Sequence, residues 1–482
     1  MARADGRGVL RALAVVVLVL LCWGATAPIA NAHADDPARA ASAALGAQLH
    51  RVGSPAAAYA VLDGDTVVTG ASGDADQDTP FVIGSLSKSF TAVGVMRAVD
   101  AGLVDLDRPV TTYLPEFTTA SSSEITVAQL LHHTSGLSTA DGIRDLLEPE
   151  RTLAQRVALA RDFEPTAPPG ERFQYSNINY AILGLLLEQV SGKTFAGYLR
   201  DEVVMPLGLS RTILDVETAR DLIPGTVPFF GFAMPRPESE FPGALADGYI
   251  ISTARDLLTY AKFHLSDGRG VLSPESMAAL HEPGIGLPGD PDPTSVGYAM
   301  GWYTGESESH PVIHHEGDNF GYRTDIALYP ELGRAIVVLM ARNGAVSMVD
   351  TPISAALPVL AGGQPRPSNT YTVATWLVIA LAATLLGTIA WTVLSYRRRA
   401  RDRRAPNRIL ALSLILTGLA LGGAALVAAL LLVGGRASAL PLAWLSAPDV
   451  TVLLIAWPVV LTVAGAAAAA QRRTLGPQDA MT

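Results

Sequence analysis

The chain of 482 residues contains a single cysteine, and this scarcity excludes several kinds of site. Cys22 lies in an apolar run near the N-terminus, within a segment that has the pattern of an export signal. If that segment is cleaved, the mature chain has no cysteine, so disulfides, a thiol nucleophile and cysteine metal sites are excluded. Leu21 precedes Cys22 where lipid-attachment signals carry a small residue, so we do not expect a lipoprotein.

Two further absences narrow the chemistry. The nine histidines show no H-E-x-x-H or comparable spacing, so the sequence predicts no metal site and no cofactor. It also contains no G-x-S-x-G motif, which argues against the nucleophile elbow of α/β-hydrolases.

The N-terminal 32 residues are predicted to direct export. Three arginines precede the apolar run 12–22, and Ala30 and Ala32 form an A-x-A cleavage pattern. The alternative is an uncleaved anchor helix. In both cases the segment that follows crosses the membrane.

Long apolar runs without charge are confined to the C-terminal part of the chain, at 372–394, 409–435 and 451–470. Each is about 20 residues or longer, which is enough to cross a bilayer. The connection 395–408 carries seven arginines, and by the positive-inside rule it faces the cytoplasm. We therefore expect three transmembrane helices in the cell membrane, a cytoplasmic C-terminus and an extracytoplasmic domain before residue 372. The helices contain no ionisable group for transport and are predicted to serve as an anchor.

The segment between the signal and the apolar runs is strongly acidic, with a net charge of −19 over residues 35–370. Such a domain repels polyanions, so nucleic acid is not expected as a partner. We place one domain at 38–362 and a linker at 363–371, which contains the polar stretch "QPRPSNT".

Periodicity within this domain predicts an α+β fold. An amphipathic helix is expected near 39–53, and strands that flank an Asp-Gly turn form a hairpin at 57–73. A second hairpin is expected at 322–342, around a turn at 330–333, and apolar spacings of three and four make the middle, 124–280, mostly helical. Strands at both ends predict one antiparallel sheet closed by its N- and C-terminal strands, with a helical subdomain.

One of the three lysines, Lys88, follows Ser85 by three residues in "FVIGSLSKSFTAVG". Residues spaced i, i+3 on a helix share a face and can touch. A neutral lysine can activate a serine hydroxyl if burial and nearby charges lower its pKa. Gly84 permits a sharp turn into the helix, which would leave Ser85 at an N-terminus whose backbone N–H groups can bind an oxyanion. A solvated helix start that carries a lysine by chance is the alternative.

Two more motifs follow in order: Tyr175 and Asn177 in "FQYSNINY", and His315 and Gly317 in "IHHEGDNFGY". The order S-x-x-K, Y-x-N and H-x-G resembles that of the penicillin-recognising serine hydrolases, which include class C type β-lactamases, D-alanyl-D-alanine peptidases and esterases. The contexts "LLHHTSGL", "PPGERFQYSNINYAILGLLLEQVSGKTFAGYL", "MPLGLSRT" and "GYIISTARDL" are also similar, so the resemblance spans about residues 40–360.

The resemblance implies a role for each matching residue. Ser85 is the acylated nucleophile and Lys88 its base. Tyr175 passes protons to the leaving group and activates the deacylating water, and His315 lends partial positive charge near Tyr175. Asn177 binds a substrate amide and holds Lys88. The backbone N–H groups of Ser85 and Asp318 form the oxyanion hole, and a side chain at Gly317 would block the cleft.

Glu316 departs from the pattern of this family, which has Thr or Ser at the middle of the third motif. The hydroxyl there helps to bind the carboxylate of a β-lactam or of a terminal D-alanine, whereas a carboxylate would repel it by roughly 1 to 4 kcal/mol. We therefore predict weak or absent β-lactamase activity and a small-molecule or peptide substrate. It is an ester, an amide without a free carboxylate or a cationic peptide, in a role related to the cell wall.

Two other interpretations stay open. The domain is alternatively a non-catalytic module that senses or binds the envelope, although retention of Ser85, Lys88, Tyr175 and His315 argues against it. The other is an assembly or morphology protein in which weak hydrolysis is incidental. His132 and His133 resemble catalytic residues, but we interpret both as structural parts of the cleft rim.

Overall fold

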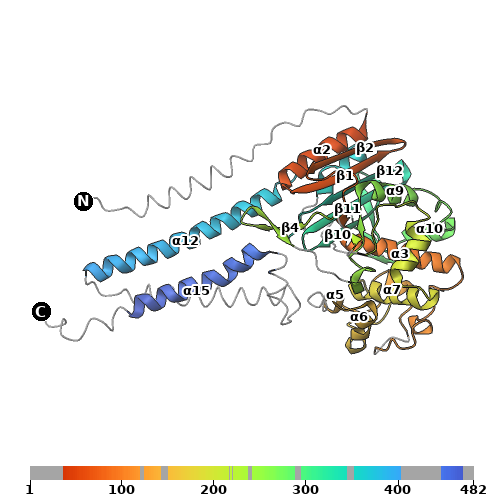
Figure 1. The fold of residues 1–482 in the computed structure, drawn as a ribbon, viewed down its shortest axis with the longest axis horizontal. Coiled ribbons are helices and arrows are strands. Elements are labelled where there is room, and N and C mark those ends of the chain that lie inside the picture. Colours follow the sequence, from red (N-terminus) through yellow and green to blue (C-terminus); the bar gives the residue numbers. More distant parts are fainter. Residues whose placement is uncertain are drawn as a thin grey trace.

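The computed structural model describes residues 36–119, 124–142, 150–215, 218–219, 221–236, 242–287, 295–344, 352–402, 444 and 447–470. The predicted signal, the arginine-rich connection beyond 402 and the apolar run 409–435 lie outside these ranges. In the described part, one large sheet and a helical lobe pack together as one domain. Two long helices extend away from this domain (Figure 1).

The sheet has eight antiparallel strands in the order β2-β1-β12-β11-β10-β9-β8-β7. Its strands are β1 (Ala56–Asp63), β2 (Thr66–Gly73), β7 (Ile285–Gly286), β8 (Gly297–Tyr298), β9 (Tyr303–Ser307), β10 (His310–Asn319), β11 (Tyr322–Tyr329) and β12 (Arg334–Met340). The N-terminal strand β1 pairs with the C-terminal strand β12, from Ala57 opposite Met340 to Asp63 opposite Arg334. Closure of the sheet by its two chain ends is thus confirmed, as are the hairpins β1–β2 and β11–β12.

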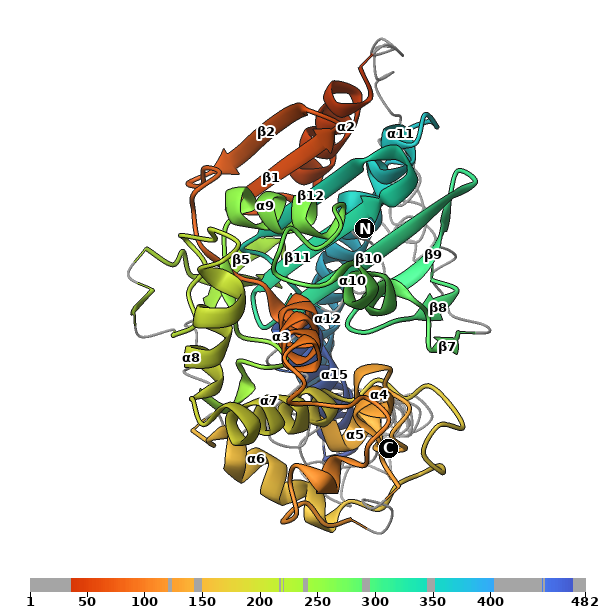
Figure 2. The same cartoon turned by 90° about the vertical axis from the view of Figure 1, so that its right-hand side faces the viewer.

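The helices are α2 (Pro37–Val52), α3 (Ser87–Asp100), α4 (Val127–Leu131), α5 (Thr139–Gly142), α6 (Leu153–Leu159), α7 (Asn177–Ser191), α8 (Phe195–Leu199), α9 (Ala254–His264), α10 (Pro274–His281), α11 (Leu357–Leu360), α12 (Thr370–Asp402) and α15 (Pro448–Ala470). Figure 2 shows α4 to α7 gathered in a lobe below the sheet, with α3 between the two. The site described below lies where α3 meets the sheet.

The sheet is buried on both faces, and the residues of β1 show why. Ala58, Ala60 and Leu62 belong to the core shared with α3 and α9, whereas Ala57 and Val61 belong to the core under α2 and α11. Because side chains alternate along a strand, a strand covered on both faces needs a nearly continuous apolar run. The sequence "AAAYAVL" supplies it, and the result is a three-layered arrangement.

Two short sheets complete the fold. β3 (Phe81–Val82) pairs with β6 (Ile251–Ser252), and β4 (Gly225–Phe229) pairs with β5 (Phe232–Arg236). The hairpin β4–β5 lies within the region predicted to be mostly helical. Pro228 and Pro235 obscured it, because proline is tolerated only at strand edges and normally argues against a strand.

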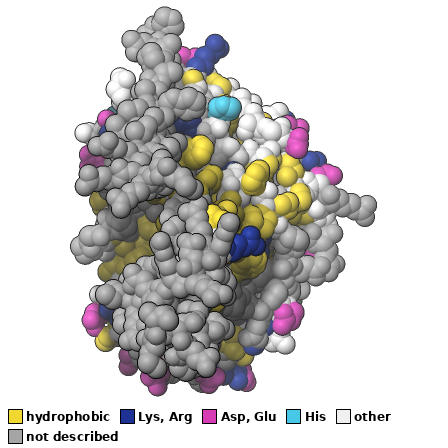
Figure 3. All heavy atoms as spheres, turned by 90° about the vertical axis from the view of Figure 1, so that its left-hand side faces the viewer, with side chains coloured by type: hydrophobic (Ala, Val, Ile, Leu, Met, Phe, Trp, Pro, Cys, Tyr) yellow, Lys and Arg dark blue, Asp and Glu magenta, His cyan; other side chains and the backbone are white. Residues whose placement is uncertain are grey.

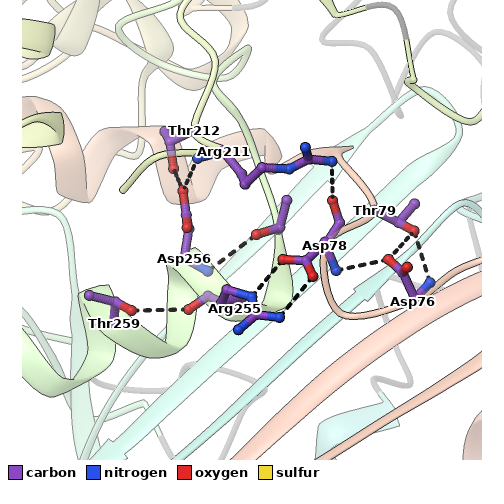
Figure 4. A network of polar contacts seen from close by, with 9 residues as sticks. Asp76, Asp78, Thr79, Arg211, Thr212, Arg255, Asp256 and Thr259 are labelled. Atoms are coloured by element: carbon purple, nitrogen blue, oxygen red, sulfur yellow. Dashed lines mark hydrogen bonds and ion pairs between the residues drawn. The ribbon is translucent and has the colours of Figure 1, made fainter. Parts of the chain in front are cut away.

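A surface network fixes the loop that leads from β2 into β3 (Figure 4). The guanidinium of Arg255, at the start of α9, donates to both carboxylate oxygens of Asp78 at 2.6 and 2.8 Å, and these hydrogen bonds lower the pKa of Asp78. Arg211 donates to the Asp78 carbonyl at 3.1 Å. Exposed pairs contribute little to stability individually, so the main effect of the network is to position the chain that enters β3.

α12 and α15 each contain a stretch long and apolar enough to cross a membrane, Thr372–Ala390 and Pro448–Ala466, the two candidates found among the described residues. Each stretch is 19 residues long. The two helices lie side by side and run away from the sheet domain in the same direction (Figure 1).

Candidate active site

Ser85 lies in a sharp turn that joins β3 to α3. Gly84 has a φ of +55°, a conformation that a side chain would strain. A Cβ at Gly84 would also lie 2.6 Å from the backbone nitrogen of Asp318, so the turn and strand β10 approach too closely for any residue but glycine. The turn is held from the other side by Ile250, whose N–H donates to Ser87 Oγ at 3.1 Å. Ser85 itself is half-buried.

Lys88 lies directly beneath this serine. Its Nζ is 3.1 Å from Ser85 Oγ and donates to the backbone carbonyl of Asp247 at 2.6 Å. The side chain is fully buried. Burial lowers the pKa of Lys88 to about 7, the charge of Asp247 partly opposes this shift, and that of Arg156 adds to it. A substantial fraction of the amine is therefore neutral near pH 7 and able to accept the Ser85 proton.

A buried ion pair positions Asp247, whose backbone carbonyl accepts the hydrogen bond from Lys88. Arg156, on α6, forms a two-pronged contact with Asp247, in which Nη1 lies 2.5 Å from Oδ1 and Nη2 3.2 Å from Oδ2. Both side chains are nearly inaccessible to solvent. Arg156 also donates to the Gly243 carbonyl, so the segment that carries Asp247 is fixed to the helical lobe.

Tyr175 is the second group in contact with Ser85. A hydrogen bond to Ser85 favours the phenolate, but burial outweighs it and holds the pKa of Tyr175 well above its usual value. Lys88 Nζ lies 4.9 Å from the centre of the ring. Tyr175 is consequently a neutral phenol in the resting site, suited to donate a proton or to relay one.

His315, on β10, is almost completely buried. Its Nδ1 lies within hydrogen-bond distance of the Glu316 carbonyl, and its ring centre is 6.5 Å from that of Tyr175. Burial, with a smaller contribution from Lys88, lowers the pKa of His315 to about 3. The imidazole is neutral at physiological pH. His315 therefore carries no full charge, and the partial positive charge predicted near Tyr175 would come from the N–H of its neutral ring.

Beyond His314, the residues of β10 have no partner in β9, so one edge of the strand is open beside Ser85. Gly317 lies on this stretch. A Cβ there would lie 1.8 Å from the Ile83 carbonyl oxygen. The requirement for glycine thus comes from the backbone of the nucleophile turn and not, as expected, from obstruction of the cleft.

The carboxylates of this stretch face an arginine on the next strand. Glu316 is opposite Asp325 and Asp318 is opposite Arg323 in the β10–β11 register. Arg323 is buried and contacts Asp318 and Asp325, each at 2.6 Å. Burial raises the pKa of Glu316 to about 7, and Asp318 and Asp325 add to this shift while Arg323 opposes it. Glu316 therefore changes charge near neutral pH.

A search with protein-family models identifies residues 41–359, about two thirds of the chain, as a match to the model described as Beta-lactamase. The chain belongs to the β-lactamase family. This is the family of serine β-lactamases, transpeptidases and related hydrolases whose motif order the sequence shares.

Curated relatives of the family agree with this assignment. The chain is 29% identical over 290 residues to Penicillin-binding protein 4 of Amycolatopsis lactamdurans, covering 56% of this chain and 74% of that protein. It is 29% identical over 309 residues to the Unguisins hydrolase ungD' of Aspergillus campestris, covering 59% and 58%. It is 28% identical to Protein flp of Staphylococcus aureus, covering 56% and 54%. The chain thus spans little more than half the length of two of these three relatives.

Solved structures of β-lactamase-family proteins share the fold. The octameric penicillin-binding protein homologue from Pyrococcus abyssi superposes with a TM-score of 0.59 at 26% identity, covering 67% of this chain and 77% of that one. A D-stereospecific amidohydrolase from Streptomyces sp. gives 0.56 at 25% identity, covering 63% and 94%.

Asn177, the third residue of the family's second motif, makes no hydrogen bond to Lys88, although the resemblance implied that it holds the lysine. It begins α7, and its buried Oδ1 has no hydrogen-bond partner among the described residues. Lys88 is held by Asp247 in its place. A backbone carbonyl from a loop 159 positions away leaves no motif in the sequence, so this partner was not predictable from spacing.

His133 contributes more to the site than the sequence suggested. It is fully buried, and its ring centre lies 4.3 Å from that of Tyr175. Its Nδ1 accepts from the Ser176 N–H at 3.2 Å and lies 3.0 Å from Asn179 Nδ2. These contacts agree with a structural role for His133. The residue packs against the ring of Tyr175, however, and not at the cleft rim. Its φ of +55° is a left-handed backbone conformation, which residues other than glycine seldom adopt.

The pKa of Lys88 near 7 predicts how acylation depends on pH. Only the neutral amine accepts a proton, so labelling of Ser85 should rise as pH increases through about 7. The Glu316 carboxylate raises the pKa of Lys88, so Glu316→Gln should move the midpoint to lower pH. Rates of labelling by an alkyl fluorophosphonate between pH 5 and 9 would test both statements. An unchanged midpoint in Glu316→Gln would contradict the coupling.

Proposed function

We propose that this protein is a membrane-anchored extracytoplasmic serine hydrolase that forms an acyl-enzyme on Ser85. The observation that carries the proposal is the buried Lys88 amine, 3.1 Å from Ser85 Oγ and with a pKa lowered to about 7. The relatives named as a hydrolase and an amidohydrolase favour transfer of the acyl group to water.

The geometry suggests how the reaction proceeds. Lys88 takes the Ser85 proton while Oγ attacks the substrate carbonyl, and the N–H groups of Ser85 and Asp318 bind the oxyanion that forms. The C–O or C–N bond then breaks, and the leaving group takes a proton that returns from Lys88 through Tyr175. Water then attacks the acyl carbonyl, and its proton passes through Tyr175 to Lys88. The bond between the acyl carbon and Ser85 Oγ breaks, and Oγ takes a proton back from Lys88 as the acid is released. The neutral ring of His315 offers hydrogen-bonding nitrogens near Tyr175.

The same site suggests which substrates are accepted. Glu316 and Asp318 place two carboxyl groups on the open edge of β10, with one arginine, Arg323, paired to Asp318 and Asp325. Arg323 is thus already shared between two carboxylates of the described residues when a substrate with a free carboxylate binds at this position. We therefore propose esters, amides without a free carboxylate or cationic peptides, in a role related to the cell wall, with β-lactamase activity weak or absent.

The two long helices support the membrane anchor. Both leave the catalytic domain in the same direction (Figure 1), as expected if the apolar run 409–435, outside the described residues, crosses back between them. The seven arginines in 395–408 support a cytoplasmic position for that loop and an extracytoplasmic position for the catalytic domain.

Covalent labelling tests the proposed activity. The purified protein is exposed to an alkyl fluorophosphonate and, separately, to a fluorescent penicillin, with Ser85→Ala as the control, and adducts are located by mass spectrometry. We expect the fluorophosphonate to modify Ser85 and the penicillin to react slowly or not at all. Absence of both adducts on folded protein would instead support the non-catalytic envelope module.

Glu316→Thr tests the proposed selectivity. Threonine restores the hydroxyl typical of the family and removes a carboxyl that repels anions when ionised, a repulsion of roughly 1 to 4 kcal/mol between nearby charges. Nitrocefin turnover should therefore increase, by about tenfold or more, since 1.4 kcal/mol corresponds to a factor of ten. The isosteric Glu316→Gln removes only the charge and serves as the matched control. Efficient nitrocefin hydrolysis by the unaltered protein would contradict the selectivity.

A further inference from the structure

The tip of the β4–β5 hairpin combines aromatic side chains with an unfavourable backbone. Its turn reads Phe229-Phe230-Gly231-Phe232, and Phe230 and Gly231 have φ values of +48° and +90°. Turns of this kind favour Asn, Asp or Gly at both central positions, and a bulky residue at positive φ is strained. Phe232 is also 77% exposed. The tip thus presents aromatic rings to its surroundings at a cost in local stability.

The hairpin contains no acidic residue. From 225 to 236 it reads "GTVPFFGFAMPR", with one charge, Arg236, at its base. The domain around it has a net charge of −19, and the hairpin carries none of that acidic charge. Aromatic rings at an apolar tip with a basic residue above them are the composition that membrane interfaces favour.

The tip lies against both long helices. A Cβ at Gly231 would lie 3.3 Å from Thr375 and 3.7 Å from Ile379, on α12. The Phe230 N–H donates to the Asp449 carboxylate, in the first turn of α15, at 3.0 Å. Ile379 is seven residues inside the candidate span that starts at Thr372, about 10 Å along the helix axis at 1.5 Å per residue. The tip is therefore level with an apolar turn of α12 and with the first turn of α15, which contains Asp449. Figure 3 views the molecule from the side toward which α12 and α15 run and shows hydrophobic side chains among the described residues of that face.

We infer that the tip of the β4–β5 hairpin, Phe229 to Phe232, inserts into the lipid bilayer beside α12 and α15 and holds the catalytic domain on the membrane surface. The inference rests on the proposed membrane anchor. Its ligand is the bilayer interface, because the tip is continuous with two apolar helices whose own exposed faces require lipid.

The base of the hairpin connects this contact to the active site. The Thr226 N–H lies 3.1 Å from the carbonyls of Gly321 and Ala341, and the Thr226 hydroxyl donates to Ala341 at 2.7 Å. Gly321 belongs to the turn that ends β10, the strand with Glu316 and Asp318. Membrane insertion would therefore fix the open edge of β10 near the bilayer and favour substrates held close to it.

Spin labels on single cysteines test the insertion in the full-length chain. In a Cys22→Ser background, Phe232→Cys, Leu381→Cys and Glu275→Cys are each labelled with a nitroxide and reconstituted into vesicles of phosphatidylethanolamine and phosphatidylglycerol. Leu381 is 51% exposed on α12 and reports on the span, whereas Glu275 is exposed on α10 and serves as the aqueous reference. Power saturation compares collisions with oxygen, which concentrates in lipid, and with a water-soluble nickel chelate.

We expect the oxygen-to-nickel collision ratio at Phe232→Cys to exceed that at Glu275→Cys severalfold and to approach that at Leu381→Cys. An aqueous ratio at Phe232→Cys with a lipid ratio at Leu381→Cys would overturn the insertion while the anchor stands. Shielding of Phe232→Cys from both reagents would also overturn it, because the tip would then be covered by protein. An aqueous ratio at Leu381→Cys would overturn the anchor itself and the insertion with it.

Discussion

Lys88→Met is expected to slow acylation of Ser85 by about 10²–10⁴-fold, the usual contribution of a positioned general base. Methionine is unbranched and of similar length, and its thioether suits the fully buried position of Lys88. The substitution removes the proton acceptor 3.1 Å from Ser85 Oγ. It also leaves the Asp247 carbonyl without its lysine donor, at a cost of about 1–3 kcal/mol in stability. Fluorophosphonate labelling rates and thermal unfolding measure the two effects separately.

Two control variants define what Lys88 contributes. Lys193→Met removes a lysine that is 43% exposed and paired with Asp201, and should leave labelling unchanged. Lys88→Arg keeps a positive charge but cannot accept a proton, since the guanidinium does not titrate in proteins. We expect it to be as slow as Lys88→Met. Fast labelling of folded Lys88→Arg would show that charge, and not basicity, is the contribution of Lys88.

The contacts that sequence predicted are those with a local or periodic cause. Ser85 and Lys88 meet because residues spaced i, i+3 share a helix face. The hairpins β1–β2 and β11–β12 follow from strand-forming segments on either side of a turn. The family resemblance placed Tyr175 and His315 at the same site, and the structure brings both ring systems together.

The contacts that sequence did not predict depend on tertiary approach or on burial. Lys88 donates a hydrogen bond to the backbone carbonyl of Asp247. Every residue type has such a carbonyl, so the sequence gives no sign of this contact. The neutral state of His315 follows from complete burial, which the motif H-x-G does not reveal. The approach of Gly317 to the Ile83 carbonyl likewise depends on how β10 crosses the nucleophile turn. These contacts and this burial arise only in the folded chain, so the sequence alone does not reveal them.

Arg156→Met is expected to lower the free energy of unfolding by about 3–5 kcal/mol, because it leaves the buried Asp247 carboxylate uncompensated. Asp247→Asn in the same chain removes that stranded charge, so the double variant should regain much of the stability. The buried Trp302 provides a fluorescence signal for unfolding of the catalytic domain. A double variant no more stable than Arg156→Met alone would contradict the assignment of this cost to the Asp247 charge.

The same pair of variants should also move the pH profile of acylation. Arg156 lowers the pKa of Lys88 and Asp247 raises it. Arg156→Met removes the first effect and leaves the second unopposed, so the midpoint of Ser85 labelling should shift to higher pH. In the double variant both charges are absent and the midpoint should return toward its original value. A purely structural role for Arg156 would reduce stability without this shift and its reversal, so the labelling midpoint separates a residue that tunes the catalytic lysine from one that only supports the fold.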